Sequence, residues 1–211
     1  MVILGLTGSI GMGKTVAAGM FRRLGIPVHD ADAAVHRLLG AKGGAVAAAI
    51  TAAFPGVVSG GTIDRAALGR RVFDDPAALQ RLEEILHPAV RRDQAGFLKR
   101  QARRGCRLAI LDVPLLFETG TDADCDAVAV VSAPPFVQEA RVLARPGMTR
   151  QRLAAIRARQ MADAEKRRRA DFLIPSGLGR RETLRAVARI AARAQTLRPQ
   201  RWPWTDPAAR P

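Results

Sequence analysis

The sequence predicts an α/β fold in which helices flank a five-stranded parallel sheet. Five short apolar runs have the length of buried strands, and segments with a helical spacing of apolar residues follow them. A glycine-rich loop links the first run to the first helical segment, an arrangement that opens many parallel sheets. Because strands alternate with helices along the chain, we expect the strands to be parallel. The five runs are residues 2–6, 26–29, 108–111, 126–131 and 171–174.

The first two elements enclose a phosphate-binding motif. Residues 8–15, here called the phosphate loop, read Gly-Ser-Ile-Gly-Met-Gly-Lys-Thr. The helix expected from residue 14 to 24 aims backbone N–H groups and the positive end of its dipole at one point, which favours a bound phosphate. In this motif Lys14 reaches the terminal phosphates and the Thr15 hydroxyl holds Mg²⁺. The candidate nucleotide-binding residues are Gly8, Gly11, Met12, Gly13, Lys14, Thr15 and Val16, with the glycines expected to bring the backbone close to the anion.

The second strand ends in a pair of carboxylates, Asp30 and Asp32. Ligands of parallel sheets collect beyond the carboxyl ends of the strands, so both side chains are candidates for chemistry beside the phosphate loop. The alternative for either one is structural, because an aspartate here can cap the helix expected over residues 33–39.

Residues 41–104 are expected to be mostly helical. A helix over residues 45–54 precedes a Pro-Gly and a Gly-Gly break, Asp64 opens a short helix, and Pro76 lies in the first turn of another. Pro88 is expected to end or kink that helix after His87. Because no strand pattern appears here, we interpret the segment as a helical insertion that holds substrate.

The third strand ends at Asp112, the position where phosphate-loop proteins commonly hold the magnesium shell. After the fourth strand, Pro134-Pro135 starts a helix that carries Arg141 and Arg145 on one face. Further helices are expected over residues 150–161 and 180–197, and the proline-rich tail 198–211 is expected to be poorly ordered.

Composition restricts the function less than the motifs do. The net charge of +15 permits nucleic-acid binding, a polyanionic small substrate or simply a solvated arginine-rich surface. Only 4% of residues are aromatic, so stacking platforms for single strands are scarce. Cys106 and Cys125 form no Cys-x-x-Cys pair, which predicts reduced cysteines, no metal site and a cytoplasmic protein. We expect no signal peptide and no membrane span, since the uncharged stretch 43–63 is broken by Pro-Gly.

Several classes of phosphate-loop protein can be compared with the sequence. A switch GTPase requires a glycine three residues after the magnesium-site aspartate, where Leu115 stands, and an Asn-Lys-x-Asp motif, although the chain contains no asparagine. A small-molecule kinase requires an acceptor site, lid arginines and a base, for which the chain offers candidates. Within the small-molecule kinases more than one small metabolite remains possible as the acceptor, and a nucleic-acid-associated ATPase remains as an alternative from a different class.

The chain resembles the dephospho-coenzyme A kinase family from residue 1 to about 197. The His87-Pro88 segment and residues 112–118 are the most specific of the matching segments. The family pattern has Gly at Ser9 and a small residue at Met12, which fits if these backbone φ angles stay negative. It reads Asp-Asn where Pro175-Ser176 stands. The matching segments are residues 6–14, 30–32, 64–69, 82–88, 111–118, 160–161 and 169–174.

The resemblance implies a P-loop kinase-type fold with a helical substrate-binding insertion and a small helical lid. It implies phosphorylation of the ribose 3′-hydroxyl of dephospho-coenzyme A by ATP with Mg²⁺, giving coenzyme A and ADP. The expected protein is a cytoplasmic monomer, or at most a weak oligomer, with no nucleic-acid or membrane partner. The implied parts are a nucleotide-binding core (1–31, 105–135 and 167–197), a substrate domain (32–104) and a lid segment (136–166).

The resemblance also assigns roles to individual residues. The alternatives are structural: His87 could simply end a helix, Glu118 could be a solvated loop residue, and Arg145 could pair with a nearby acid such as Glu139 or stay solvated. The implied catalytic residues are Lys14, Asp32 and Arg141; the implied substrate contacts are Asp30, Asp32, Arg65, His87, Leu115 and Glu118; the implied metal ligands are Thr15 and Asp112.

Overall fold

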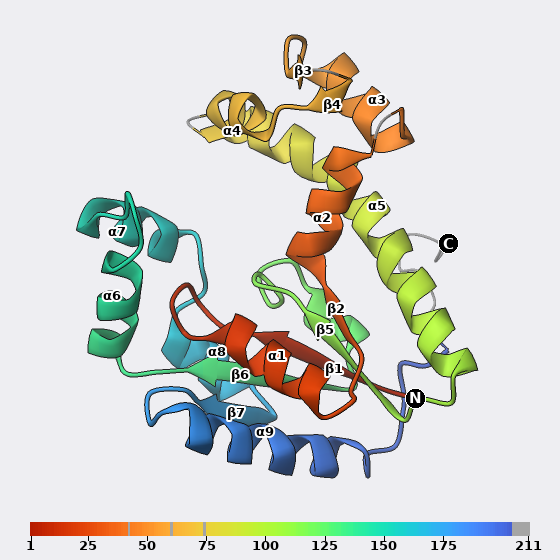
Figure 1. Ribbon diagram of the computed structural model, residues 1–211, viewed down its shortest axis with the longest axis vertical. Coiled ribbons are helices and arrows are strands. Elements are labelled where there is room, and N and C mark those ends of the chain that lie inside the picture. Colours follow the sequence, from red (N-terminus) through yellow and green to blue (C-terminus); the bar gives the residue numbers. More distant parts are fainter. Residues whose placement is uncertain (42, 60, 74, 204–211) are drawn as a thin grey trace. The chain divides into compact units, whose positions relative to one another are not determined.

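A computed structural model describes residues 1–41, 43–59, 61–73 and 75–203 (Figure 1). Its main sheet has five strands, and the printed pairings of β1 with β5, β1 with β6 and β6 with β7 are all parallel. The five apolar runs therefore form the five strands, and the predicted α/β fold is confirmed. In sheet order the strands are β2 (Val28–Asp30), β5 (Leu108–Asp112), β1 (Val2–Thr7), β6 (Ala127–Ser132) and β7 (Phe172–Pro175).

The sheet and two helices share one apolar core. All six residues of β1 are buried, as expected for the central strand of a parallel sheet. Helices α1 (Lys14–Arg23) and α9 (Arg180–Ala194) contact each other and contribute Phe21 and Ile190 to the same core as Leu4 (Figure 1). This core fixes the end of β1 and the start of α1, and so positions the phosphate loop between them.

The remaining elements of the first unit follow β5. A 3₁₀ turn covers Thr121–Asp124, and α6 (Pro135–Leu143), α7 (Arg150–Ala158) and α8 (Asp163–Arg169) lie between β6 and β7 in the chain. Helix α8, which contacts β6, was missed by the sequence analysis because its seven residues are mostly charged and show no apolar periodicity.

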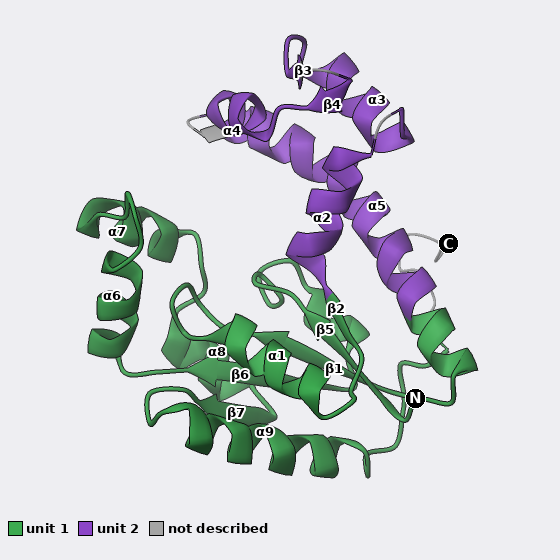
Figure 2. Ribbon diagram, viewed as in Figure 1, with its two compact units in different colours: residues 1–29, 98–205 green, residues 30–97, 206–211 purple. Residues whose placement is uncertain are grey.

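The chain divides into two compact units, which are coloured separately in Figure 2. Among the described residues the second unit comprises 30–97 and has its own apolar core, which includes Ile50, Phe54 and Leu68. The three-part division into core, substrate domain and lid stays a prediction. The elements that begin in the second unit are α2 (Ala31–Gly40), α3 (Ala45–Ala53), β3 (Val58–Ser59), β4 (Thr62–Ile63), α4 (Arg65–Phe73) and α5 (Pro76–Arg103).

Two features of the second unit differ from the expectations. Helix α5 runs through Pro88 and spans 28 residues, so the alternative that the proline ends the helix after His87 is wrong, while the alternative of a kink stays a prediction. Leu86 and Ala89, on either side of the proline, are both buried, and their packing offsets the cost of the proline. The second unit also contains a short antiparallel hairpin, β3–β4, in which Val58 pairs with Ile63. A Gly-Gly pair between β-branched residues is a hairpin signal that the sequence analysis treated only as a helix break.

The end of the chain is partly described. Residues 204–211 of the predicted tail lie outside the described residues. Before them, the backbone N–H groups of Gln200 and Arg201 donate to Asp126 Oδ1 at 2.6 and 2.8 Å. None of the described helices combines the length and the apolar character that crossing a membrane requires.

Candidate active site

The phosphate loop has the backbone conformation that its glycines allow. Gly11 and Gly13 have φ angles of 76° and 87°, a region that side chains rarely adopt, and Gly13 is the N-cap of α1. No non-glycine residue in the described part of the chain has a positive φ, so Ser9 and Met12 fit as predicted. At Gly8 the structure gives a reason for glycine other than the expected close approach of the backbone to the anion. A Cβ there would lie 2.7 Å from the Val131 carbonyl oxygen, so glycine is needed for packing on β6.

Lys14 and Asp112 meet at the start of α1. The Lys14 ammonium lies 2.5 Å from Asp112 Oδ1, and both side chains are largely buried, with 14% and 3% exposed. The two come together because β5 pairs with β1 in a register that places Asp112 beside Leu6. The predicted phosphate-binding lysine and Asp112, one of the two predicted magnesium ligands, therefore face the same point. The other predicted ligand, Thr15, is the second residue of α1 and is exposed.

Arg141 of α6 also contacts the phosphate loop. Its guanidinium donates to Ser176 Oγ at 3.0 Å, to the Ser176 carbonyl at 2.7 Å and to the Gly11 carbonyl at 3.5 Å. The Ser176 hydroxyl donates to the Met12 carbonyl at 2.6 Å. Ser176, which stands where the family pattern has Asn, thus joins Arg141 to the loop. Arg145 does not pair with Glu139, whose carboxylate instead lies 3.2 Å from Arg150 Nε.

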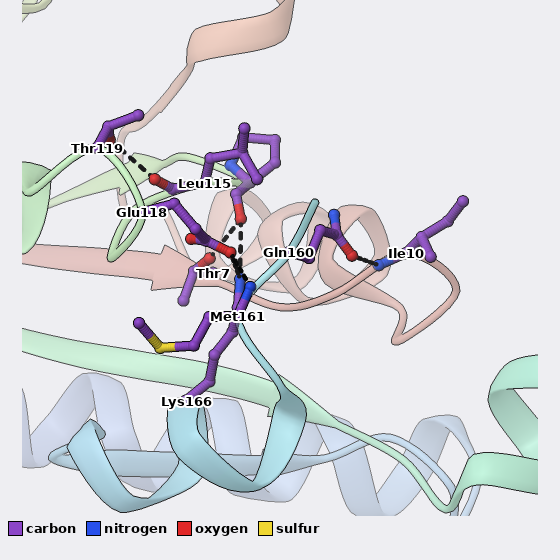
Figure 3. Close-up of polar contacts among 9 residues, drawn as sticks. Thr7, Ile10, Leu115, Glu118, Thr119, Gln160, Met161 and Lys166 are labelled. Carbon is purple, nitrogen blue, oxygen red and sulfur yellow. Dashed lines mark hydrogen bonds and ion pairs between the residues drawn. The ribbon is translucent and has the colours of Figure 1, made fainter. Parts of the chain in front are cut away.

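The segment after Asp112 is fixed by a buried ion pair (Figure 3). The Lys166 ammonium lies 2.8 Å from Glu118 Oε1, and the Lys166 side chain has no exposed surface. The same Glu118 oxygen accepts from the Met161 N–H at 2.7 Å, and the Pro114 carbonyl accepts from Lys166 at 3.3 Å and from Thr7 Oγ1 at 2.9 Å. Glu118 is therefore not a solvated loop residue.

The electrostatics of Glu118 follow from these contacts. Burial alone would raise the pKa of its carboxyl, but the hydrogen bonds from Lys166 and from the Met161 N–H outweigh burial and lower the pKa below its ordinary value. The neighbouring Leu115 is half-buried, and its carbonyl accepts from the N–H and the hydroxyl of Thr119 at 3.0 and 2.8 Å. These bonds tighten the loop after β5 into a fixed turn.

Lys166→Met is expected to lower the free energy of unfolding by about 3 kcal/mol, because it leaves the Glu118 carboxylate in a largely buried site without its cation. Urea unfolding near neutral pH measures this loss. The double variant Lys166→Met/Glu118→Gln should regain most of the stability, since glutamine is neutral and still accepts from Met161. A double variant as unstable as Lys166→Met would show that the lost stability comes from packing of the lysine stem.

The same pair predicts a pH dependence with a definite sign. Because the pKa of Glu118 is lower in the folded protein than in the unfolded chain, the pair stabilises the fold fully above the unfolded value. That contribution is lost as the pH falls through the lower, folded value. The stability difference between the parent and Glu118→Gln should therefore shrink as the pH falls below about 4. A difference that is constant with pH would contradict the ionic pair.

The other candidate residues belong to the second unit. Asp30 is the N-cap of α2 and accepts from the Ala33 N–H at 3.0 Å, so the capping alternative holds for Asp30 and is wrong for Asp32. Asp32 lies in the first turn of α2 with an exposed side chain. Arg65, the first residue of α4, and His87, within α5, are also exposed. His87 does not end its helix.

Sequence reasoning missed the long-range partners in this site. Ser176 appeared only as a departure from a pattern, and Lys166 only as the last residue of the predicted lid segment. Gln138 carried no motif of its own, and Gln160 appeared only within the matching segment 160–161, yet both side chains contact the phosphate loop. Their partners lie far away in the chain, and no local periodicity signals such a contact.

Comparisons with known proteins agree on one family. A sequence model of dephospho-CoA kinase matches residues 2–178. A dephospho-CoA kinase from Paramagnetospirillum magneticum is 65% identical over 167 residues, which cover 79% of this chain and 78% of that protein. Another from Mesorhizobium japonicum is 54% identical over 201 residues, covering 95% of this chain and 99% of that protein.

Solved structures support the fold. A crystal structure from Thermus thermophilus is 36% identical with a TM-score of 0.75, covering 93% of this chain and 98% of that one. A dephospho-CoA kinase from Campylobacter jejuni, at 21% identity, supports the fold with a TM-score of 0.63 and covers 91% of this chain and 96% of that one.

Proposed function

The chain belongs to the dephospho-CoA kinase family, whose activity is the last step of coenzyme A synthesis, and we propose that it transfers the γ-phosphoryl group of ATP to the ribose 3′-hydroxyl of dephospho-CoA with Mg²⁺. The observation that carries the proposal is the contact of Lys14 with Asp112 at the phosphate loop. It supplies a cation for the transferred group and an oxygen ligand for a metal at one point.

The residues present fit Mg²⁺. This ion prefers oxygen ligands and is usually bound through one or two carboxylates together with substrate phosphates. Asp112 and the Thr15 hydroxyl provide such oxygens. The described residues include no cluster of three or more His, Cys, Asp or Glu that could hold a metal alone, in keeping with a metal that also depends on the nucleotide. When bound, Mg²⁺ would neutralise charge on the phosphate oxygens.

The chain's own residues have the following proposed roles. The acceptor hydroxyl oxygen forms a bond to the γ-phosphorus as the bond to the β-phosphate oxygen breaks, and ADP leaves. Asp32 accepts or orients the proton of that hydroxyl. Lys14 and Arg141 offset the negative charge of the transferred group, because phosphoryl transfer depends mainly on positioning and charge.

The proposed contacts with the acceptor rest on the family resemblance. In the second unit they are Asp30, Arg65 and His87, of which Arg65 offers a cation for the substrate's phosphates. In the loop after β5 they are Leu115 and Glu118. Glu118 Oε2 is buried and makes no hydrogen bond within the described part of the chain, so a contact of this oxygen with the acceptor would require the loop to move.

A coupled assay for ADP tests the proposed function. With Mg²⁺ and ATP, dephospho-CoA should support turnover, whereas adenosine and other small hydroxyl acceptors should support little. The product should be shown by mass spectrometry and by loss of the free 3′-hydroxyl. ADP release that is independent of dephospho-CoA but stimulated by DNA or RNA would instead support a nucleic-acid-associated ATPase.

Arg141→Lys is expected to lower kcat by about tenfold or more at saturating ATP, because lysine keeps the charge but lacks the planar fork that holds two oxygens. The matched control is Arg145→Lys, since Arg145 is exposed and follows α6. Steady-state kinetics separate two roles. A rise in the ATP KM alone would mean that Arg141 only holds Ser176 and the loop, and parent-like kinetics would refute both roles.

A further inference from the structure

The backbone of Ile10, at the tip of the phosphate loop, is held by two glutamine side chains. Its N–H donates to Gln160 Oε1 at 3.1 Å, a contact drawn in Figure 3, and its carbonyl accepts from Gln138 Nε2 at 2.8 Å. Gln138 belongs to α6, and Gln160 lies between α7 and α8. The two glutamines come from either side of α7, near the two ends of the predicted lid segment.

Gln138 is itself fixed by a third residue. It is 4% exposed, and its Oε1 accepts from Arg157 Nη2 of α7 at 2.5 Å. Both ends of the Gln138 amide are therefore used, one toward α7 and the other toward the loop. A Cβ on Gly11 would lie 3.1 Å from the Gln138 carbonyl oxygen and 2.5 Å from Val142, so α6 packs directly on the loop.

We propose that Gln138 and Gln160 are positioning residues that clamp the Ile10 backbone and hold the phosphate loop in its nucleotide-binding conformation. This inference rests on the proposed binding of ATP by that loop. A loop whose N–H groups already converge does not lose conformational freedom when the anion binds, which improves affinity. Losing either glutamine should weaken ATP binding and leave the acceptor KM nearly unchanged.

The roles of the two amides differ, and this difference gives the sharpest test. Gln160 acts toward Ile10 as an acceptor, which glutamate can replace. Gln138 acts toward Ile10 as a donor, which glutamate cannot replace because its carboxylate has no N–H. Gln160→Glu should therefore bind ATP better than Gln160→Leu, whereas Gln138→Glu should bind no better than Gln138→Leu. Both glutamates add the same charge near the loop, so repulsion alone does not produce this asymmetry.

The experiment measures the Kd of a non-hydrolysable ATP analogue by calorimetry in Mg²⁺ for the parent and each variant. Gln138→Leu and Gln160→Leu should each raise Kd by about tenfold, as expected for loss of one hydrogen bond that leaves a backbone group unpaired. The control Gln151→Leu, at an exposed position of α7, should change Kd by less than about twofold. The double leucine variant should lose less than the product of the single losses, because both residues act on the same residue.

The outcomes separate this inference from the proposed function. A parent that does not bind the analogue refutes ATP binding itself. If the parent binds and the leucine variants bind equally well, the clamp is wrong. Equal recovery by glutamate at both positions would also overturn it. Melting temperatures identify a variant that fails to fold. If that happens at one of the two positions, the comparison of the glutamate and leucine variants at the other position still decides the result.

Discussion

Lys14→Ala is expected to abolish phosphoryl transfer in a protein that remains folded. The Lys14 ammonium lies at the start of α1, where the loop glycines and the helix dipole favour phosphate, and its contact with Asp112 places it at the proposed metal ligand. No other residue of the phosphate loop carries a positive charge. The loss in kcat should be on the order of 10³-fold, the cost of removing a key group that stabilises transition-state charge.

The measurement must separate catalysis from stability. Alanine also removes the cation from beside Asp112, which is buried, so some loss of stability is expected as well. Thermal unfolding and circular dichroism should show a folded variant at the assay temperature. Lys99→Ala, at an exposed position of α5, is the matched control and should keep its turnover. A folded Lys14→Ala protein with turnover close to the parent's would refute the assignment.

The sheet and the centre of the site were predictable because their signals are local. Each strand is a short apolar run, and hydrophobic burial depends on composition over a few residues. The position of Lys14 beside Asp112 also followed, since a loop after one strand and an aspartate at the end of another meet at the same edge of a parallel sheet. The observed strands begin and end close to the predicted runs; the largest difference is at β2, which is Val28–Asp30 where residues 26–29 were expected.

The rest of the site was not predictable from local patterns. Pro88 breaks a helix by propensity, but burial of its neighbours outweighs that cost, so α5 continues. Contacts such as Glu118 with Lys166 and Arg141 with Ser176 depend on how distant segments pack. A lysine within a charged segment does not by itself indicate complete burial. Only the partner, 48 positions earlier in the chain, explains why Lys166 is buried.

The second large effect is expected at Asp32. The structure removes one alternative for this residue, because Asp30 caps α2 and Asp32 lies in its first turn with an exposed side chain. An exposed carboxylate in the first turn gains only a few tenths of a kcal/mol from the helix dipole, so Asp32→Asn should hardly change stability. Asparagine has nearly the same shape as aspartate but cannot accept a proton from the substrate hydroxyl.

Asp32→Asn is therefore expected to lower kcat by about 10²-fold or more, the contribution typical of a positioned general base, with the Kd for ATP within about twofold of the parent's. The matched control is Glu83→Gln, which removes a carboxylate charge at an exposed position of α5 in the same unit. Single-turnover experiments at saturating ATP and dephospho-CoA isolate the chemical step from product release. If Asp32→Asn keeps its single-turnover rate and loses only stability, Asp32 serves the helix dipole, and the proton of the acceptor hydroxyl must leave by another route.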